Sequence, residues 1–111
     1  MNRPLDYATT QPERAEIDAL PGLTLLEFGV AWCPHCQAAQ APLARALAGE
    51  PAIRHLKIED GPGRPLGRSF RVKRWPTLIL LQDGHEVARL ERPTEAGAIT
   101  AALRQRKAPT A

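Results

Sequence analysis

Two cysteines, Cys33 and Cys36, are the only ones among the 111 residues, and two positions separate them. This spacing lets one thiol attack a disulfide and the other resolve the mixed disulfide that forms. A cysteine at a helix N-terminus faces unpaired backbone N–H groups and the positive end of the helix dipole, which stabilise a thiolate. The sequence therefore predicts Cys33 as the nucleophile, at the start of a helix, and Cys36 as the more buried resolving thiol.

The two residues between the cysteines, Pro34 and His35, are expected to tune this chemistry. Pro34 pre-sets the backbone angle of a first helical turn. A protonated His35 adds positive charge beside the thiolate, so we expect it to lower the pKa of Cys33. A lower pKa makes Cys33 a better leaving group, and the pair is therefore predicted to be comparatively oxidising.

Other uses of a C-x-x-C pair fit this sequence less well. It can be half of a zinc site, but no further cysteine is present, so His35, His55 or His85 would have to complete it. The usual spacing of zinc ligands is absent. A structural disulfide across so short a loop would stabilise little. We predict no metal and no other cofactor, because the cysteine pair is itself the redox centre.

Length and composition predict one domain over residues 1–111, with an N-terminal arm at 1–10 and a C-terminal tail at 107–111. Apolar residues make up 43% of the chain and charged residues 24%, as in soluble proteins. The first twenty residues carry charges and no signal-peptide pattern, and no apolar run is long enough to span a membrane. We therefore expect a cytoplasmic protein with no membrane partner. A net charge of +3 does not by itself indicate a nucleic-acid partner, and no nucleic-acid-binding module is recognisable.

The hydrophobic pattern predicts alternating helices and strands. Residues 23–30 are apolar on both alternating faces, which is typical of a central strand covered on both sides. The predicted elements are a short strand near Leu5 and Tyr7, a helix over 12–20 with Pro12 in its first turn, strands over 23–30 and 52–59, a helix over 34–48, a short helix within 64–71, strands over 77–81 and 86–91 joined by a turn at Asp83–Gly84, and a helix capped by Thr94 that runs to about Arg106. This order predicts an α/β fold, a mixed sheet with helices on both faces.

Three motifs, taken in this order and spacing, resemble the thioredoxin superfamily. They are Phe-Gly-Val-Ala-Trp-Cys-Pro-His-Cys at 28–36, Trp-Pro-Thr at 75–77, and Asp-Gly at 83–84. The resemblance covers roughly residues 12–106. It implies a thioredoxin-like fold, thiol–disulfide exchange with protein substrates, and a role in cell redox homeostasis.

The resemblance also assigns further site residues. It implies that Pro76 is cis, lies against the cysteine pair and, with its neighbours Trp32 and Trp75, binds extended substrate backbone. Glu27 matches the buried acid that assists proton transfer in thioredoxins, and it interrupts a strand that otherwise looks buried. We expect its burial to raise its pKa, so that it can exchange protons with Cys36. The alternative is a carboxylate that reaches solvent or forms an ion pair.

The chain departs from the thioredoxin pattern at several positions. Pro34-His35 replaces the usual Gly-Pro and resembles the periplasmic disulfide oxidases, although the chain has no room for their inserted helical domain. Gly29 stands where thioredoxins often have a tryptophan, which puts docking to a standard thioredoxin reductase in doubt. Trp75 stands where a smaller residue is common, so it could reshape the substrate groove or pack against Trp32. His55 falls near a lysine that partners the buried acid in thioredoxins; we take it as an ordinary strand histidine, with a functional role as the alternative.

The direction of exchange stays open at this point. We expect protein thiol or disulfide substrates, a redox partner protein or glutathione for recycling, and a monomer. The alternatives are a thioredoxin-fold binding or chaperone module without turnover, or a zinc-binding module. The segment 61–82 is basic, and we expect a solvated face rather than a rim for acidic partners. Its cations are Arg64, Arg68, Arg71, Lys73 and Arg74.

Overall fold

The structure is a computed structural model that describes residues 3–106, so the predicted tail at 107–111 lies outside the described residues. The described elements, in chain order, are α1 (Arg14–Asp18), β1 (Leu23–Gly29), α2 (Pro34–Ala48), β2 (Arg54–Glu59), α3 (Pro65–Ser69), β3 (Thr77–Gln82), β4 (His85–Glu91) and α4 (Ala96–Leu103). This is the predicted order of helices and strands. Among the described helices, none is both long and apolar enough to cross a membrane.

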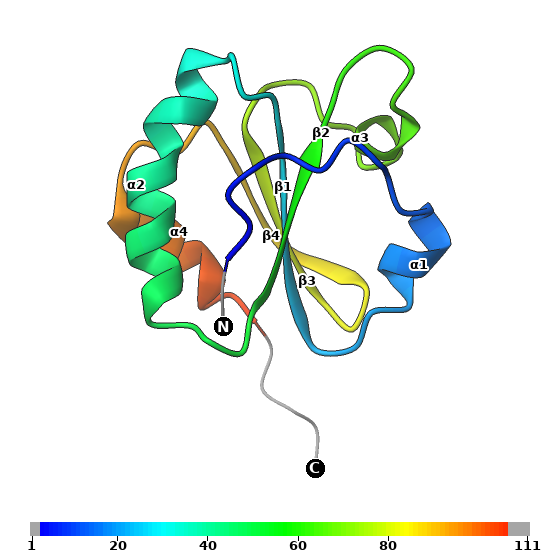
Figure 1. Ribbon diagram of the computed structural model, residues 1–111. Helices are drawn as coiled ribbons and strands as arrows, with labels where there is room; N and C mark the ends of the chain where they lie inside the picture. The colour runs from blue at the N-terminus through cyan, green and yellow to red at the C-terminus, as the bar shows by residue number, and fades with distance from the viewer. Residues whose placement is uncertain (1–2, 107–111) are drawn as a thin grey trace.

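The strands form one mixed sheet in the order β2-β1-β3-β4. β1 pairs parallel with β2 and antiparallel with β3, and β3 pairs antiparallel with β4. β1 is therefore an inner strand, as its apolar sequence predicts. Helices α2 and α4 cover one face of the sheet, while α1 and α3 cover the other (Figure 1).

Alternating residues of β1 supply both faces of the core. Leu25 belongs to a buried cluster with residues of α2 and α4, whereas Leu26 and Phe28 belong to a second cluster with residues of α1 and α3. These three side chains are at most 2% exposed. Burying an apolar side chain of this size contributes about 1.5–3 kcal/mol, so packing on both faces fixes β1 at the centre of the sheet.

The helix that follows β1 is bounded by residues with a clear local role. Cys33 is its N-cap, Pro34 occupies the first helical position, and Gly49 is its C-cap. Pro34 loses nothing there because its missing N–H would have no partner inside the helix. The predicted helix over 34–48 is confirmed, and with it the position of the cysteine pair at a strand-to-helix junction.

The turn between β3 and β4 is also confirmed. Asp83 and Gly84 have φ angles of 51° and 83°, which suits a two-residue hairpin turn. The helix starts predicted at Pro12 and at the Thr94 cap are wrong by two residues and one residue, respectively. α1 begins at Arg14 because the backbone N–H of Glu13 donates to the Glu16 carboxylate at 3.1 Å, closing the helix start at Glu13.

The last helix is shorter at both ends than predicted. Glu95, not Thr94, is the N-cap of α4, and Arg104 is its C-cap. Arg106 lies beyond the helix, where its guanidinium forms an ion pair with Glu50 at 2.8 Å. This ion pair holds the end of the described chain against the loop after α2.

The N-terminal arm contains one β-bridge in place of the predicted strand. Ala8 pairs in parallel with Ile58, through Ala8 N–H to the Lys57 carbonyl at 2.8 Å and Glu59 N–H to the Ala8 carbonyl at 3.0 Å. The Lys57 ammonium also donates to the Leu5 carbonyl at 2.9 Å. The arm therefore lies along the outer edge of β2. This position brings the side chain of Tyr7, the residue before Ala8, against the cysteine pair.

Candidate active site

The cysteine pair lies where β1 ends and α2 begins. Both cysteines carry free thiols, and they form a small buried cluster with Val30. Cys33 is 6% exposed and Cys36 is 1% exposed. The structure thus places the more accessible thiol at the helix N-terminus and the less accessible one inside the first turn, as predicted.

The pKa of Cys33 lies below its usual value. Burial is the largest single influence and acts to raise this pKa, but hydrogen bonds from the Cys36 backbone and thiol and from the His35 backbone, together with the charge of Arg92, outweigh it. The predicted direction is confirmed. His35 is exposed, and its backbone N–H at the helix start is one of the donors that lower the pKa of Cys33. The predicted contribution of the His35 imidazole stays a prediction.

The pKa of Cys36 moves the other way. Burial raises it to about 11, and the neighbouring Cys33 sulfur adds to the increase. Hydrogen bonds from the Val30 backbone and the Tyr7 hydroxyl lower it only in part. The two pKa values therefore move in opposite directions, and Cys33 loses its proton at a lower pH than Cys36.

Glu27 is fully buried on β1, behind the cysteine pair. The prediction of a raised pKa is wrong. Burial does act to raise it, but hydrogen bonds from His55, Gln40 and Tyr7, together with the charge of His55, lower the pKa below its usual value. The alternative of a carboxylate paired with His55 holds instead, because His55, Gln40 and Tyr7 together offset the cost of burying the carboxylate.

His55 on β2 is the direct partner of this carboxylate, so its interpretation as an ordinary strand histidine is wrong. Its Nε2 lies 2.8 Å from Oε1 of Glu27, and its side chain is 5% exposed. Gln40 of α2 donates to Oε2 of Glu27 at 2.9 Å. In turn, the Lys57 ammonium donates to Oε1 of Gln40 at 2.7 Å, which fixes the amide in the orientation that serves Glu27.

Tyr7 is a site residue that the sequence analysis missed. Its hydroxyl donates to Oε2 of Glu27 at 2.8 Å and is also hydrogen-bonded to the Cys36 thiol. The Lys57 ammonium lies 4.6 Å from the centre of its ring. The one signal in the sequence was Gly29: a Cβ there would lie 2.6 Å from the Cys36 sulfur and 2.7 Å from the Tyr7 hydroxyl oxygen. The missing side chain leaves the space that Tyr7 fills.

The segment that contains Trp75 and Pro76 lies beside the cysteines. The Trp75–Pro76 peptide bond is cis, as the resemblance implied, and Trp75 packs against the cluster of Cys33 and Cys36. Trp75 meets Trp32 edge to face, with ring centres 5.8 Å apart, and its indole N–H donates to Asp60 at 2.9 Å. Trp32 is 72% exposed, so an aromatic surface borders the buried thiols.

Arg92 is a second residue that the sequence analysis missed. Its backbone N–H donates to the Pro76 carbonyl at 2.9 Å, and its Nε donates to the Trp75 carbonyl at 3.0 Å. Its backbone has a φ angle of 50°. These contacts hold the guanidinium where its charge helps to lower the pKa of Cys33. No local sequence pattern indicates this, since Arg92 follows β4 and lies far from Cys33 in the chain.

The basic segment behaves largely as a solvated face. Arg64 forms an ion pair with Glu59, whereas Arg68, Lys73 and the other cations of the segment are exposed. Over the described part of the chain, no group of three or more His, Cys, Asp or Glu side chains is placed to hold a metal ion.

Comparison with known proteins gives a consistent result. The sequence profile of the thioredoxin family matches residues 7–105. The structure of thioredoxin 2 from Pseudomonas aeruginosa PAO1 in its reduced form superposes with a TM-score of 0.81 and 54% identity, covering 89% of this chain and 92% of that one. The predicted thioredoxin-like fold is therefore confirmed.

Curated relatives include protein disulfide-isomerases and thioredoxins. Protein disulfide-isomerase A2 from Pongo abelii is 39% identical over 93 residues, which cover 78% of this chain but only 18% of the relative. Thioredoxin from Chlamydia trachomatis is 41% identical over 70 residues, which cover 61% of this chain and 67% of the relative. The chain thus spans less than a fifth of the isomerase that it matches and about two thirds of the thioredoxin.

Proposed function

Because the chain belongs to the thioredoxin family, we propose that it is a thiol–disulfide oxidoreductase that exchanges disulfides with protein substrates through Cys33 and Cys36. The observation that carries this proposal is the placement of two free thiols in one small cluster, Cys33 as the N-cap of α2 and Cys36 in its first turn. The pKa directions agree with it, since the pKa of Cys33 is lowered and that of Cys36 is raised. A nucleophile needs the thiolate form, whereas a resolving thiol must keep its proton until the mixed disulfide has formed.

In the reductive direction, the Cys33 thiolate attacks one sulfur of a substrate disulfide. The S–S bond of the substrate breaks, its other sulfur leaves as a thiolate that takes a proton from water, and Cys33 is joined to the substrate. Cys36 then loses its proton and attacks the Cys33 sulfur, which releases the second substrate thiolate and closes the Cys33–Cys36 disulfide. Two electrons pass from the pair to the substrate, and the reverse sequence oxidises a substrate dithiol.

Substrate binding is assigned to the aromatic surface and the turn next to it. Trp32 and Trp75 border the thiols, and the exposed ring of Trp32 offers apolar contact area to an incoming chain. Pro76 follows Trp75 directly, so we assign it a role in holding extended substrate backbone beside Cys33. This role is supported by position and by family resemblance.

The direction of the reaction depends on the potential of the pair and on the protein that recycles it. A lowered pKa of Cys33 stabilises the reduced form, so we propose a comparatively oxidising pair. A redox partner protein or glutathione would recharge it. The cytoplasmic location, the monomeric state and a role in cell redox homeostasis stay predictions.

An insulin reduction assay with dithiothreitol as the reductant tests the proposal. The wild-type protein is expected to accelerate the reduction of insulin by dithiothreitol, and Cys33→Ser is expected to abolish this acceleration. Cys36→Ser is expected to accumulate mixed disulfides with the substrate, which mass spectrometry detects. Normal turnover by either variant would contradict the assignment. A substrate protein retained equally by the double Cys→Ser variant would favour a binding module without turnover.

A further inference from the structure

Positive charge is concentrated on one surface beside the active site. The segment 61–82 contains five cations and no acid, although the net charge of the whole chain is only +3. A groove of about 500 Å³ lies along the loop before α3, the helix itself and the turn after it. We call it the basic groove, because four of the cations line it: Arg64, Arg68, Arg71 and Lys73.

Three of these cations have no partner within the described part of the chain. Arg64 forms an ion pair with Glu59. Arg68, Arg71 and Lys73 are exposed, and among residues 3–106 their side chains form no hydrogen bond or ion pair. They face solvent in the isolated chain, as the sequence predicts. Their charges repel one another there, and a bound negative group would offset that repulsion.

Arg71 occupies a backbone position that favours glycine. Its φ angle is 59°, in the left-handed region, and it follows Phe70, the C-cap of α3. Its backbone N–H donates to the Arg68 carbonyl, and that of Val72 donates to the Gly67 carbonyl, both at 2.9 Å. A helix end closed by these two bonds usually has glycine at the left-handed residue, because a Cβ is unfavourable there. Glycine would serve the helix end better, so the arginine is explained by its charge rather than by the fold.

A second arginine with this backbone conformation lies beside the cysteines. Arg92 has a φ angle of 50°, and its charge helps to lower the pKa of Cys33. Arg71 and Arg92 are two of the three non-glycine residues with positive φ in the described chain. Such positions are uncommon for side chains other than Asn, Asp and His, and they mark functional sites. The pair indicates that this surface carries positive charge even where the backbone disfavours a side chain.

Trp75 joins the basic groove to the cysteine pair. Its indole N–H donates at 2.9 Å to Asp60, which lines the groove. Its ring packs against the buried cluster of Cys33 and Cys36. Asp60 is the one acid among the residues that line the groove, and this hydrogen bond holds its carboxylate. A substrate chain that passes over Trp75 therefore meets the groove within a few residues of its own cysteine.

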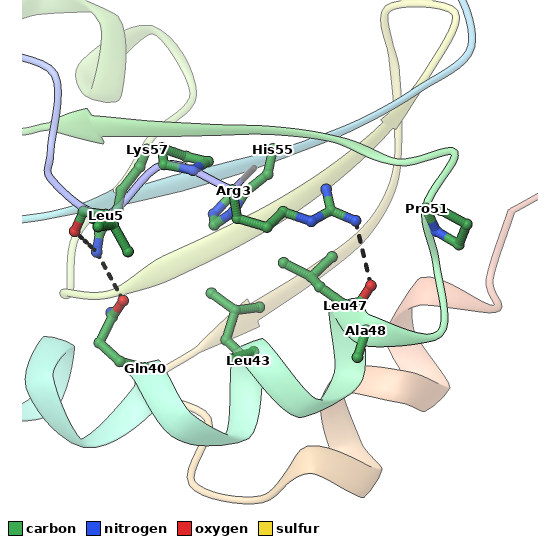
Figure 2. A pocket seen from close by; sticks show the side chains of 11 residues that line it. Arg3, Leu5, Gln40, Leu43, Leu47, Ala48, Pro51, His55 and Lys57 are labelled. Carbon is green, nitrogen blue, oxygen red and sulfur yellow. Dashed lines mark hydrogen bonds between the residues drawn. The ribbon is translucent and has the colours of Figure 1, made fainter. Parts of the chain in front are cut away.

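A hollow elsewhere on the molecule also contains cations but differs from the basic groove. It has a volume of about 460 Å³ and lies between the N-terminal arm, α2 and β2. Figure 2 shows that its cations are used within the protein. Lys57 donates to Oε1 of Gln40 at 2.7 Å and to the Leu5 carbonyl at 2.9 Å. Arg3 donates to the Leu47 carbonyl at 3.3 Å. An acidic ligand would have to replace these contacts, whereas the basic groove has three cations available.

We propose that the basic groove binds acidic residues that lie close to the reactive cysteine of a substrate protein, so that the chain reacts preferentially with disulfides flanked by carboxylates. The proposal rests on the thiol–disulfide exchange proposed above and names its substrate class. It goes beyond the solvated face expected from the sequence. Guanidinium groups suit carboxylates because they can donate two parallel hydrogen bonds. Single-stranded nucleic acid fits less well, since it stacks its bases on aromatic side chains and no aromatic residue lines the groove.

Peptide 2-pyridyl disulfides test this preference on the reduced full-length chain. Two peptides differ only in the residues around their cysteine, which are glutamates in one and glutamines in the other. Attack by Cys33 on the peptide sulfur releases 2-thiopyridone, which absorbance detects. Each rate is divided by the rate with 2-mercaptoethanol, which corrects for the intrinsic reactivity of the peptide. At low salt we expect the glutamate peptide to react about 10-fold faster, at the lower end of electrostatic steering, and this ratio should approach one at high salt.

A double variant, Arg71→Gly with Lys73→Gln, removes two charges from the basic groove. The preference for the glutamate peptide should fall to about twofold or less, while the rate with the glutamine peptide stays within about twofold of the wild type. The control variant, Arg45→Gln with Arg104→Gln, removes the same charge from exposed positions on α2 and at the end of α4. These helices cover the face of the sheet opposite α3 (Figure 1), so the control should keep the preference.

The single variant Arg71→Gly separates the charge from the fold. Glycine suits the left-handed position, so the midpoint of urea denaturation should rise although the preference for the glutamate peptide falls. A lower midpoint would show that Arg71 has a structural role and would contradict the argument from its backbone conformation.

An unchanged preference in the double variant would overturn the proposal, and so would an equal loss in the control, which indicates net charge alone. Stronger inhibition by a single-stranded oligonucleotide than by a cysteine-free glutamate peptide, at physiological salt, would assign the groove to nucleic acid instead. Release of 2-thiopyridone by Cys33→Ser at the wild-type rate would contradict the proposed function. Release that needs Cys33 but ignores the charge of the peptide would contradict only the role of the basic groove.

Discussion

The hydroxyl of Tyr7 and the carboxylate of Glu27 lie 2.8 Å apart although twenty residues separate them in the chain. This contact joins the N-terminal arm to the centre of the sheet. It gives the buried carboxylate a third donor besides His55 and Gln40, and it places a hydroxyl against the Cys36 thiol. The arm is therefore part of the active site and not only an extension of the fold.

The close approach at Gly29 predicts a large effect of a small substitution. In Gly29→Ala the new Cβ would lie 2.6 Å from the Cys36 sulfur and 2.7 Å from the Tyr7 oxygen, so one of them must move. We expect the free energy of unfolding to fall by about 1–3 kcal/mol, as for other overpacked sites. Urea denaturation measures it. Gly97→Ala is the control, because nothing lies within 4 Å of its Cβ and alanine favours helix α4, so it should stabilise the protein by up to about 1 kcal/mol.

Glu27→Gln should destabilise the protein in a pH-dependent manner. Glutamine keeps one acceptor oxygen and places an NH2 group at the other position, so one of the donors from Tyr7 and His55 loses its acceptor and the negative charge is lost, at a cost on the order of 3 kcal/mol at pH 7. The pKa of Glu27 is lowered in the folded state, so the ionised carboxylate stabilises the fold. This contribution to the free energy of unfolding is fully present above the unfolded-state pKa of about 4.3, and it is lost as the pH falls through the folded-state pKa.

The measurement is urea denaturation of the wild type and Glu27→Gln between pH 7 and pH 3. The gap in unfolding free energy between them should narrow below about pH 4.3. Glu91→Gln, on an exposed carboxylate of β4, should change stability by less than about 0.5 kcal/mol. A gap that stays constant or widens on acidification would contradict the ion-paired carboxylate.

Arg92 is expected to act on Cys33 through its charge. Arg92→Ala should raise the pKa of Cys33, whereas Arg92→Lys should retain most of the effect. The rate of iodoacetamide alkylation as a function of pH reports this pKa. Because Arg92 is exposed, the difference should shrink at high salt. Arg68→Ala, a change of an exposed cation on α3, should leave the profile unchanged; an equal shift in that variant would point to net charge instead.

The lowered pKa of Cys33 predicts the potential of the pair. Equilibration with glutathione buffers, read by the mass shift on alkylation, should give a potential less negative than the value of about −270 mV for thioredoxin. Arg92→Ala should move the potential toward more negative values, since it makes the Cys33 thiolate less stable. A wild-type value at or below −270 mV would refute the claim of a comparatively oxidising pair.

The sequence predicted those parts of the site that depend on local structure. Cys33 and Cys36 follow an apolar strand, and Pro34 comes directly after Cys33, so their place at a helix start could be derived from the chain around them. Glu27 was identified because a charge interrupts a buried strand. Its pKa direction could not be derived, since that depends on the donors Tyr7 and His55, which come from other elements.

The contacts that were missed are all long-range. Tyr7 lies in a polar arm without a hydrophobic period, and Arg92 follows an edge strand. Each reaches the site through tertiary contacts that no local pattern encodes. Gly29 was noticed as a departure from the thioredoxin pattern, but only the structure shows that a hydroxyl from the arm occupies the space beside it.

The most direct test of the central claim is the alkylation of the reduced protein, followed residue by residue with mass spectrometry across pH. The claim is that the two thiols have divided roles, with Cys33 as nucleophile and Cys36 as resolving thiol. We predict that Cys33 reacts first with an apparent pKa below the usual value of about 8.5 and that Cys36 stays largely unmodified until the pH approaches 11. Equal rates at the two cysteines, or a Cys33 pKa at or above 8.5, would contradict it.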